Sequence, residues 1–328
     1  MTDVAKHETH ADTAEGVMMQ RTLKSAIHCQ GVALHAGTNV SMTLHPAEVD
    51  TGIVFRRTDV AGKGAEIPAT WDRVVDTRLC SVLGNEDGVT VATVEHLMAA
   101  LAGCGIDNTI IEINGGEVPI MDGSSEPFVF LVECAGVVEQ EAPRRVIRVL
   151  KSVVVEHEGS RVELHPSDRF GVDIEIDFNS EAISQQRLAL RVVNGAFSKE
   201  LASARTFGFL HEVEAMRSAG LAKGGSLENA IVVSGNKILN EDGLRFDDEF
   251  VRHKALDAVG DMYLAGGQIV GAFVGYRCGH ALNNKLLHAL FADQDAWTYD
   301  VLPDNGEVCV PYGVLTGAGL NEKAVANA

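Results

Sequence analysis

The chain has 328 residues, of which 46% are hydrophobic and 22% charged, a composition typical of a folded globular protein and unlike that of a disordered or fibrous one. Its formal net charge of −19 disfavours a nucleic-acid-binding role, because such a role needs a basic surface. No apolar run approaches the roughly 20 residues that span a bilayer, and the first residues lack the apolar core of a secretory signal. We therefore expect a cytoplasmic protein without a membrane span.

The N-terminal half predicts short strands followed by helices. Alternating or β-branched segments bounded by Gly, Pro or Asp predict strands at residues 31–35, 39–44 and 52–55, several within 66–92, and a buried one at 108–113. A small insertion is expected at about residues 82–91. Thr93 as a cap and Gly103 or Gly105 as a stop predict one helix, and residues 126–135 predict a second.

The C-terminal half repeats this scheme after a polar, proline-containing segment, residues 139–145, that predicts a linker. Strands are expected near residues 146–156, 161–165, 171–178 and 268–276, and helices near 198–204, 249–265 and 281–292. The tripeptide Leu-His-Pro begins at Leu44 and again at Leu164, in comparable strand-rich positions, which hints at a duplicated domain. Residues 207–233 have no counterpart in the first half and predict an insertion.

These patterns together predict an α+β protein made of two similar domains. We place the N-terminal domain at residues 18–142 and the C-terminal domain at 143–300, with its insertion at about 207–233. Residues 1–17 are expected to form a disordered tail and residues 301–328 a C-terminal tail.

The helix expected at residues 249–265 carries the most informative pattern in the chain. His253, Asp257 and Asp261 stand at i, i+4 and i+8, so they share one helical face, while apolar residues cover much of the rest. Buried imidazole and carboxylate groups are costly unless they pair or bind a cation. An H-x-x-x-D pair can supply two of the three protein ligands of a catalytic zinc, and Glu95-His96 offers a third. An ordinary intrahelical ion pair explains the His253–Asp257 spacing equally well.

The six cysteines show no C-x-x-C spacing, and most lie in apolar surroundings. Buried free thiols in a reducing cytoplasm are the expected state. Any metal in this protein is therefore expected to be held by His and Asp rather than by thiolates.

The chain resembles a known family at several motifs that occur in the same order over about residues 20 to 300. These motifs are TVEHL from Thr93 with AALAG from Ala99, GIDN from Gly105, PIMDGS from Pro119, SARTFGF from Ser203, LNEDGLRF from Leu239, FVRHK from Phe250 continuing to Asp257 and Asp261, and GHALNNKL from Gly279. They are similar to those of the UDP-3-O-acyl-N-acetylglucosamine deacetylases, zinc amidases that commit bacteria to lipid A synthesis. The resemblance implies a β-α-α-β sandwich in each domain, with an insertion in each.

The resemblance also implies a catalytic site. His96, His253 and Asp257 match the zinc ligands, a set that suits Fe²⁺ as well. Glu95 matches the general base for attack by metal-activated water on the acetamide. Thr206 and His280 match the donors to the oxyanion. Asp261 matches the carboxylate that keeps the His280 imidazole charged, and Lys254 would add positive charge near the same pocket.

The implied substrate is UDP-3-O-(3-hydroxyacyl)-N-acetylglucosamine, which would yield the free amine and acetate. In the family the C-terminal insertion shapes a hydrophobic passage for the acyl chain, although the same apolar residues also suit a satellite core. The implied substrate-binding residues are Leu79, Cys80, Phe207, Phe209, Gly225 and Ser226.

Three other functions are compatible with parts of this sequence. A serine hydrolase is disfavoured because no G-x-S-x-G or Ser-His-Asp arrangement is present. A metal-dependent deacetylase of another amide differs only in the groove that selects the substrate. A nucleotide-sugar or acyl-chain sensor has no need of a base such as Glu95 beside a metal-bound water. No nucleic-acid partner is expected, and nothing resembles a dedicated interface, so a monomer is expected.

Overall fold

The first of two large sheets comes from the N-terminal half of the chain. The structure is a computed structural model that describes residues 16–61, 63–192 and 195–303. In spatial order the sheet contains β2 (Ile27–Val32), β3 (Asn39–Pro46), β9 (Thr109–Ile113), β4 (Ile53–Arg57) and β5 (Glu66–Pro68). The pairing of β4 with β9 is parallel, and the other pairings in this sheet are antiparallel.

The second large sheet repeats this arrangement. It contains, in spatial order, β12 (Val153–His157), β13 (Ser160–His165), β20 (Ala272–Tyr276), β14 (Gly171–Asp177) and β15 (Gln185–Arg191). Here too the third and fourth strands are parallel and the other neighbours antiparallel. Leu44 in β3 and Leu164 in β13 occupy the corresponding second strands. The duplication suggested by Leu-His-Pro and the α+β class are therefore confirmed.

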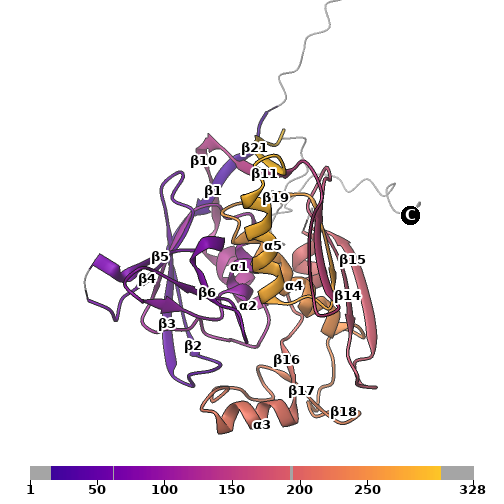
Figure 1. The fold of residues 1–328 in the computed structure, drawn as a ribbon. Coiled ribbons are helices and arrows are strands. Elements are labelled where there is room, and N and C mark those ends of the chain that lie inside the picture. Colours follow the sequence, from indigo (N-terminus) through magenta and orange to yellow (C-terminus); the bar gives the residue numbers. More distant parts are fainter. Residues whose placement is uncertain (1–15, 62, 193–194, 304–328) are drawn as a thin grey trace, which may run out of the picture.

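Four helices lie between the two sheets (Figure 1). They are α1 (Glu95–Cys104), α2 (Glu126–Ala135), α4 (Glu249–Tyr263) and α5 (His280–Ala292). The sheets turn alternate apolar residues inward, as in β14, where Val172, Ile174 and Ile176 are buried and their neighbours are not. The large core is therefore formed by the inner faces of both sheets and the helices between them.

The two central helices, α1 and α4, approach each other closely at Gly260. A Cβ atom at that position would stand 2.1 Å from the carbonyl oxygen of Glu95 and 3.1 Å from the amide nitrogen of Ala99. Only glycine, which has no Cβ, permits this approach. The sequence of α4 thus brings its polar face against the first turn of α1.

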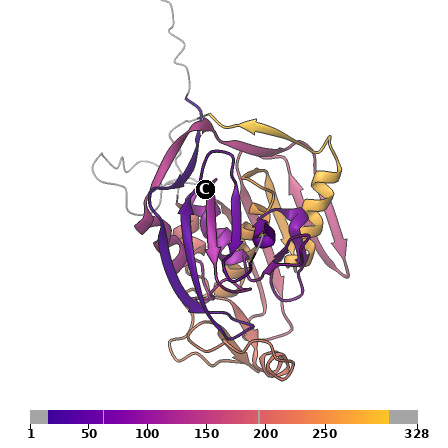
Figure 2. The ribbon, with the colours of Figure 1, turned by 90° about the vertical axis from the view of Figure 1, so that its left-hand side faces the viewer.

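Smaller elements surround this sandwich. Three small sheets contain β6 (Val74–Asp76), β7 (Val82–Gly84) and β8 (Thr90–Val91); β1 (Met19–Leu23) and β10 (Val137–Pro143); and β19 (Ile269–Val270), β11 (Arg145–Val149) and β21 (Trp297–Val301). The predicted C-terminal insertion contains β16 (Phe207–Phe209), α3 (Leu210–Ser218) and β17 (Ile231–Ser234), and β17 pairs with β18 (Lys237–Ile238). This unit projects at one end of the molecule, the lower end in both views (Figures 1 and 2). Short helical turns occupy Lys63–Ala65, Trp71–Arg73 and Phe197–Leu201.

Several local predictions were wrong for reasons of long-range pairing. The expected linker at residues 139–145 is largely β10, because β1, far away in sequence, pairs with it from Met19 opposite Pro143 to Leu23 opposite Val137. The single strand expected at 268–276 is divided at Gly271, and its two parts join different sheets. A Cβ at Gly271 would meet the side chain of Val149 at 2.7 Å.

Other differences from the predictions concern one helix, one strand and the two tails. Only a five-residue turn of π-helix forms where a helix was expected at 198–204, and β15 was not predicted. Within the predicted N-terminal tail, residues 1–15 lie outside the described residues, whereas Val17 bridges to Pro303. Residues 304–328 of the predicted C-terminal tail also lie outside them. The domain limits at 142 and 143 stay a prediction. No helix among the described residues has the length and apolar character needed to cross a membrane.

Candidate metal centre and active site

The first turn of α1 supplies two adjacent buried residues, Glu95 and His96, which are 3% and 4% exposed. The residue expected to cap this helix, Thr93, does not do so. Its backbone has a φ of 57°, in the left-handed region, and its hydroxyl donates instead to Glu117 Oε1 at 3.1 Å. Glu117 also accepts hydrogen bonds from the amides of His35 and Ala36, so a buried carboxylate ties the start of α1 to a neighbouring loop.

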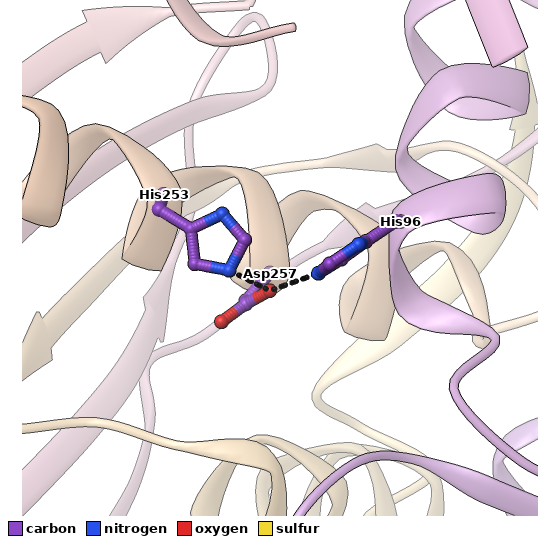
Figure 3. Close-up of side chains that lie close together, drawn as sticks. All are labelled: His96, His253 and Asp257. Atoms are coloured by element: carbon purple, nitrogen blue, oxygen red, sulfur yellow. Dashed lines mark ion pairs between the residues drawn. The ribbon is translucent and has the colours of Figure 1, made fainter. Parts of the chain in front are cut away.

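The predicted face of α4 forms as expected from its spacing. His253, Asp257 and Asp261 are buried on this helix, each no more than 4% exposed. Figure 3 shows His253 and Asp257 meeting His96 from α1. Asp257 Oδ1 lies 3.4 Å from His253 Nε2 and 3.6 Å from His96 Nε2. The three candidate ligand atoms all lie within 4.8 Å of one another.

The hydrogen-bonding pattern of this cluster fits a divalent cation. His253 Nδ1 lies 3.0 Å from the carbonyl oxygen of Ala204, which can only accept, so Nδ1 carries the proton and Nε2 presents its lone pair to Asp257. Asp257 Oδ1 has no hydrogen-bond partner among the described residues. Buried acceptors that face one another need a cation between them. Ligands about 2.0–2.1 Å from a tetrahedral ion stand about 3.3 Å apart, close to the separations seen here.

The protonation states of the cluster also suit a metal. Burial lowers the pKa of His96 to about 3 and lowers that of His253, so both imidazoles are neutral, as metal ligands must be. Burial opposes ionisation of Asp257, but neighbouring groups, the Lys254 ammonium among them, more than offset it and hold the pKa of this carboxyl below its usual range. Lys254 Nζ donates to Asp257 Oδ2 at 2.9 Å, so Oδ1 is the oxygen that faces the two histidines.

An acid–base pair stands beside the cluster. Burial is the main cause that raises the pKa of Glu95 to about 7, and His280 opposes that rise. Burial alone would lower the pKa of His280, but Asp261 and Glu95 outweigh it and raise this pKa to about 10. His280 Nδ1 lies 2.8 Å from Asp261 Oδ2, and Nε2 lies 3.8 Å from Glu95 Oε1. A carboxylate able to accept a proton therefore faces an imidazolium able to give one.

Two polar residues in this network were not predicted, Ser81 and Asn283. Ser81 donates its amide to Glu95 Oε2 at 3.1 Å and its hydroxyl to Asp261 Oδ1 at 2.6 Å. Asn283 Nδ2 donates to Asp261 Oδ2 at 2.8 Å. The i,i+3 spacing of His280 and Asn283 could have placed both on one face of α5. No local pattern marks Ser81.

The remaining predicted catalytic residue, Thr206, lies just before β16 and two residues after Ala204, the carbonyl partner of His253. Its hydroxyl makes no hydrogen bond within the part of the chain that the structure describes, and none joins it to His280. Thr206 therefore follows the backbone partner of His253 by two residues, and no hydrogen bond joins its hydroxyl to the acid–base pair among the described residues.

The predicted substrate-binding residues occupy different surroundings. Phe207 borders the cluster: its ring centre lies 6.2 Å from that of His253, and Lys254 Nζ stands 5.6 Å from its centroid. Phe207 and Phe209 both pack against Phe178, with 5.7 and 6.0 Å between ring centres. Leu79 is 47% exposed.

Cys80 and the loop that contains Gly225 and Ser226 complete the predicted set. Cys80 is buried; burial and the nearby Glu95 raise the pKa of its thiol to about 12. Gly225 and Ser226 lie in a loop whose neighbour Gly224 donates its amide to Leu34 at 2.9 Å. The amide of Ser226 is held by Asn229. Among the described residues, no hydrogen bond or ion pair joins Gly225 or Ser226 to the metal cluster.

The chain is similar to known proteins over most of its length. A family model described as UDP-3-O-acyl N-acetylglycosamine deacetylase matches residues 20–292. A protein of Nitrosococcus oceani named UDP-3-O-acyl-N-acetylglucosamine deacetylase is 52% identical over 291 residues, which cover 88% of this chain and 95% of that protein. Proteins of the same name from Shewanella halifaxensis and Shewanella pealeana are each 47% identical over 304 residues, covering 92% of this chain and 99% of theirs.

Proposed function

The chain belongs to the UDP-3-O-acyl N-acetylglycosamine deacetylase family, and from that membership we propose that it hydrolyses the acetamide of UDP-3-O-(3-hydroxyacyl)-N-acetylglucosamine. The products are the free amine and acetate, and the reaction is the committed step of lipid A biosynthesis. The observation that carries the proposal is the buried cluster of His96, His253 and Asp257 beside the facing pair of Glu95 and His280. Such a site is built for hydrolysis.

The metal proposed for the cluster is Zn²⁺, held by His96, His253 and Asp257, and the same ligands also suit Fe²⁺. A bound divalent ion lowers the pKa of water and polarises a carbonyl oxygen. Two neutral imidazoles and one carboxylate leave such an ion with a net positive charge. Lys254 holds the second oxygen of Asp257 and adds positive charge next to the site.

Glu95 is proposed as the general base. Its pKa of about 7 lies near a cytoplasmic working pH, where a base is most effective. One of its oxygens is held by the amide of Ser81, and the other faces His280. Glu95 takes the proton of the attacking water as the new C–O bond forms at the amide carbonyl.

His280 is proposed as the acid. As an imidazolium, it donates a hydrogen bond to the oxyanion that develops at the carbonyl oxygen. When the C–N bond breaks, a proton must reach the leaving nitrogen, and His280 supplies it. Asp261 holds the imidazole by its other nitrogen, at 2.8 Å, and stabilises its positive charge. Thr206, whose hydroxyl is uncommitted, is proposed as the second oxyanion donor.

The apolar insertion is proposed to receive the acyl chain. Phe207, at the start of the insertion, borders the cluster, and Leu221 and Leu227 farther along the insertion are large apolar side chains that are 37% and 47% exposed, so both are available to contact an acyl chain. The further contacts proposed for substrate are Leu79, Cys80, Phe209, Gly225 and Ser226. The protein is proposed to act in the cytoplasm as a monomer.

The test compares the rates at which zinc-loaded protein hydrolyses two substrates. Acetate and free amine are measured with UDP-3-O-(3-hydroxyacyl)-N-acetylglucosamine and with UDP-N-acetylglucosamine, which lacks the acyl chain. Release from the first and far slower release from the second are expected. Equal rates with the two substrates would contradict the proposed acyl passage. If folded, metal-loaded protein released acetate from neither substrate, the proposed reaction would be refuted.

A further inference from the structure

A single buried serine, Ser81, contacts both carboxylates that flank His280. Its side chain is only 2% exposed and lies in the loop before β7. The amide of Ser81 donates to Glu95 Oε2 at 3.1 Å, and its hydroxyl donates to Asp261 Oδ1 at 2.6 Å. Glu95 belongs to α1 and Asp261 to α4, so Ser81 bridges the two central helices at the acid–base pair.

These bonds determine which carboxylate oxygen faces the imidazole. With Glu95 Oε2 engaged by Ser81, the oxygen left toward His280 Nε2 is Oε1, at 3.8 Å. With Asp261 Oδ1 engaged by the hydroxyl, Oδ2 is left for His280 Nδ1 and for Asn283. Asp261 thus accepts from three donors, and an ionised carboxylate accepting three hydrogen bonds has little freedom to rotate.

The backbone of Ser81 is anchored independently of its hydroxyl. Its carbonyl accepts from the amide of Val94, just before α1, and its own amide is held by Glu95. Removing the hydroxyl therefore leaves the loop in place and removes one bond, the bond to Asp261.

We propose that Ser81 is a positioning residue for the deacetylation proposed above: its hydroxyl fixes the carboxylate of Asp261, and through it the orientation of the His280 imidazole. The inference rests on the proposed function, because it assigns Ser81 a part in the acid step of that reaction. Ser81 touches neither the metal ligands nor the proposed acyl passage by any hydrogen bond in the described chain. Its removal therefore affects the rate of the chemical step and leaves substrate and metal binding intact.

The first test compares Ser81→Ala with the wild-type protein, both loaded with zinc. We expect kcat to fall on the order of 10- to 100-fold, as it does when a partner that orients a site residue is lost, with KM and bound zinc unchanged. Thr109→Val is the matched control. Thr109 begins β9, and its buried hydroxyl donates a hydrogen bond to the His45 carbonyl at 2.8 Å. Removing this hydroxyl should lower stability to a similar extent without lowering kcat.

The second test asks whether Ser81 acts through His280. Ser81→Ala is combined with His280→Gln, and the two single variants complete the cycle. If the hydroxyl works by orienting the imidazole, its loss costs little once the imidazole is gone, so the two effects are far from additive. Ser81→Thr, which keeps a hydroxyl, should recover most of the lost kcat.

The outcomes separate this inference from the proposed function. An inactive wild-type protein would contradict the proposed function itself. An active wild-type protein with full kcat in Ser81→Ala would overturn the role of Ser81 and leave the function standing. Additive losses in the cycle, or a loss of bound zinc in Ser81→Ala, would show a general structural effect and would also overturn the inference.

Discussion

Substitution of Gly260 by alanine tests how the two central helices build the metal centre. The new Cβ would stand 2.1 Å from the Glu95 carbonyl oxygen, whereas contacts below 3.0 Å are essentially never seen. The helices must therefore move apart by about 1 Å at this crossing, because close-packed interiors have no free space to absorb the overlap. Alanine favours a helix over glycine by about 1 kcal/mol, but overpacking costs about 1–3 kcal/mol, so a net destabilisation of up to about 2 kcal/mol is expected.

The same movement separates the proposed ligands. His96 lies on α1 next to Glu95, and on α4 His253 lies about two turns and Asp257 about one turn before Gly260. Metal–ligand distances tolerate errors of only about 0.2 Å, so a displacement of about 1 Å between the helices exceeds that tolerance several-fold. We expect Gly260→Ala to bind zinc far more weakly and to lose at least about 100-fold in activity.

The assay measures bound zinc per protein after dialysis against a weak chelator, together with activity and thermal unfolding. Gly267→Ala is the control, because a Cβ there would have its nearest neighbour at 3.5 Å, an ordinary contact, and its φ is not positive. The control should keep its zinc and activity. One equivalent of zinc and full activity in Gly260→Ala would refute the argument that this crossing sets the metal geometry.

Three further predictions concern the catalytic groups. Glu95→Ala should keep its metal and fold while kcat falls about 10²- to 10⁴-fold, as seen by zinc analysis and acetate release; a metal-free protein would make Glu95 a ligand. Asp257→Ala should show reduced metal occupancy, since three ligands become two, and full occupancy would place the third ligand elsewhere. The raised pKa of His280, about 10, keeps the imidazolium present below that pH, so kcat/KM should fall as pH rises through about 10. Asp261→Asn removes a carboxylate that raises this pKa, so the fall should move to lower pH, and an unmoved profile would contradict the role of Asp261.

The sequence predicts those parts of the site that depend on local spacing. The face shared by His253, Asp257 and Asp261 follows from helical periodicity alone, and the structure places these residues as expected. Glu95 and His96 were adjacent in a motif, but their meeting with α4 depends on a helix crossing that only Gly260 permits. Residue type suggests that pairing and the family resemblance implies it, whereas periodicity does not.

The parts that were missed depend on contacts between distant segments. Ser81 and Asp261 are 180 positions apart, and no local pattern marks a loop serine as a partner of a helical carboxylate. The polar, proline-containing segment at residues 139–145 predicts a linker, but β1, at the other end of the domain sequence, pairs with it. Thr93 resembled a helix cap, but its hydroxyl is held by Glu117, 24 residues away. In each case a tertiary partner overrides a local preference.

The most direct test of the proposed metal centre is a titration of metal-free protein with zinc, with acetate release from UDP-3-O-(3-hydroxyacyl)-N-acetylglucosamine measured at each step. We expect no activity without metal and a linear rise that ends at one equivalent per chain. We also expect the rise to disappear in Asp257→Ala. Full activity in the metal-free protein, or an unchanged titration in that variant, would contradict a catalytic metal held by His96, His253 and Asp257.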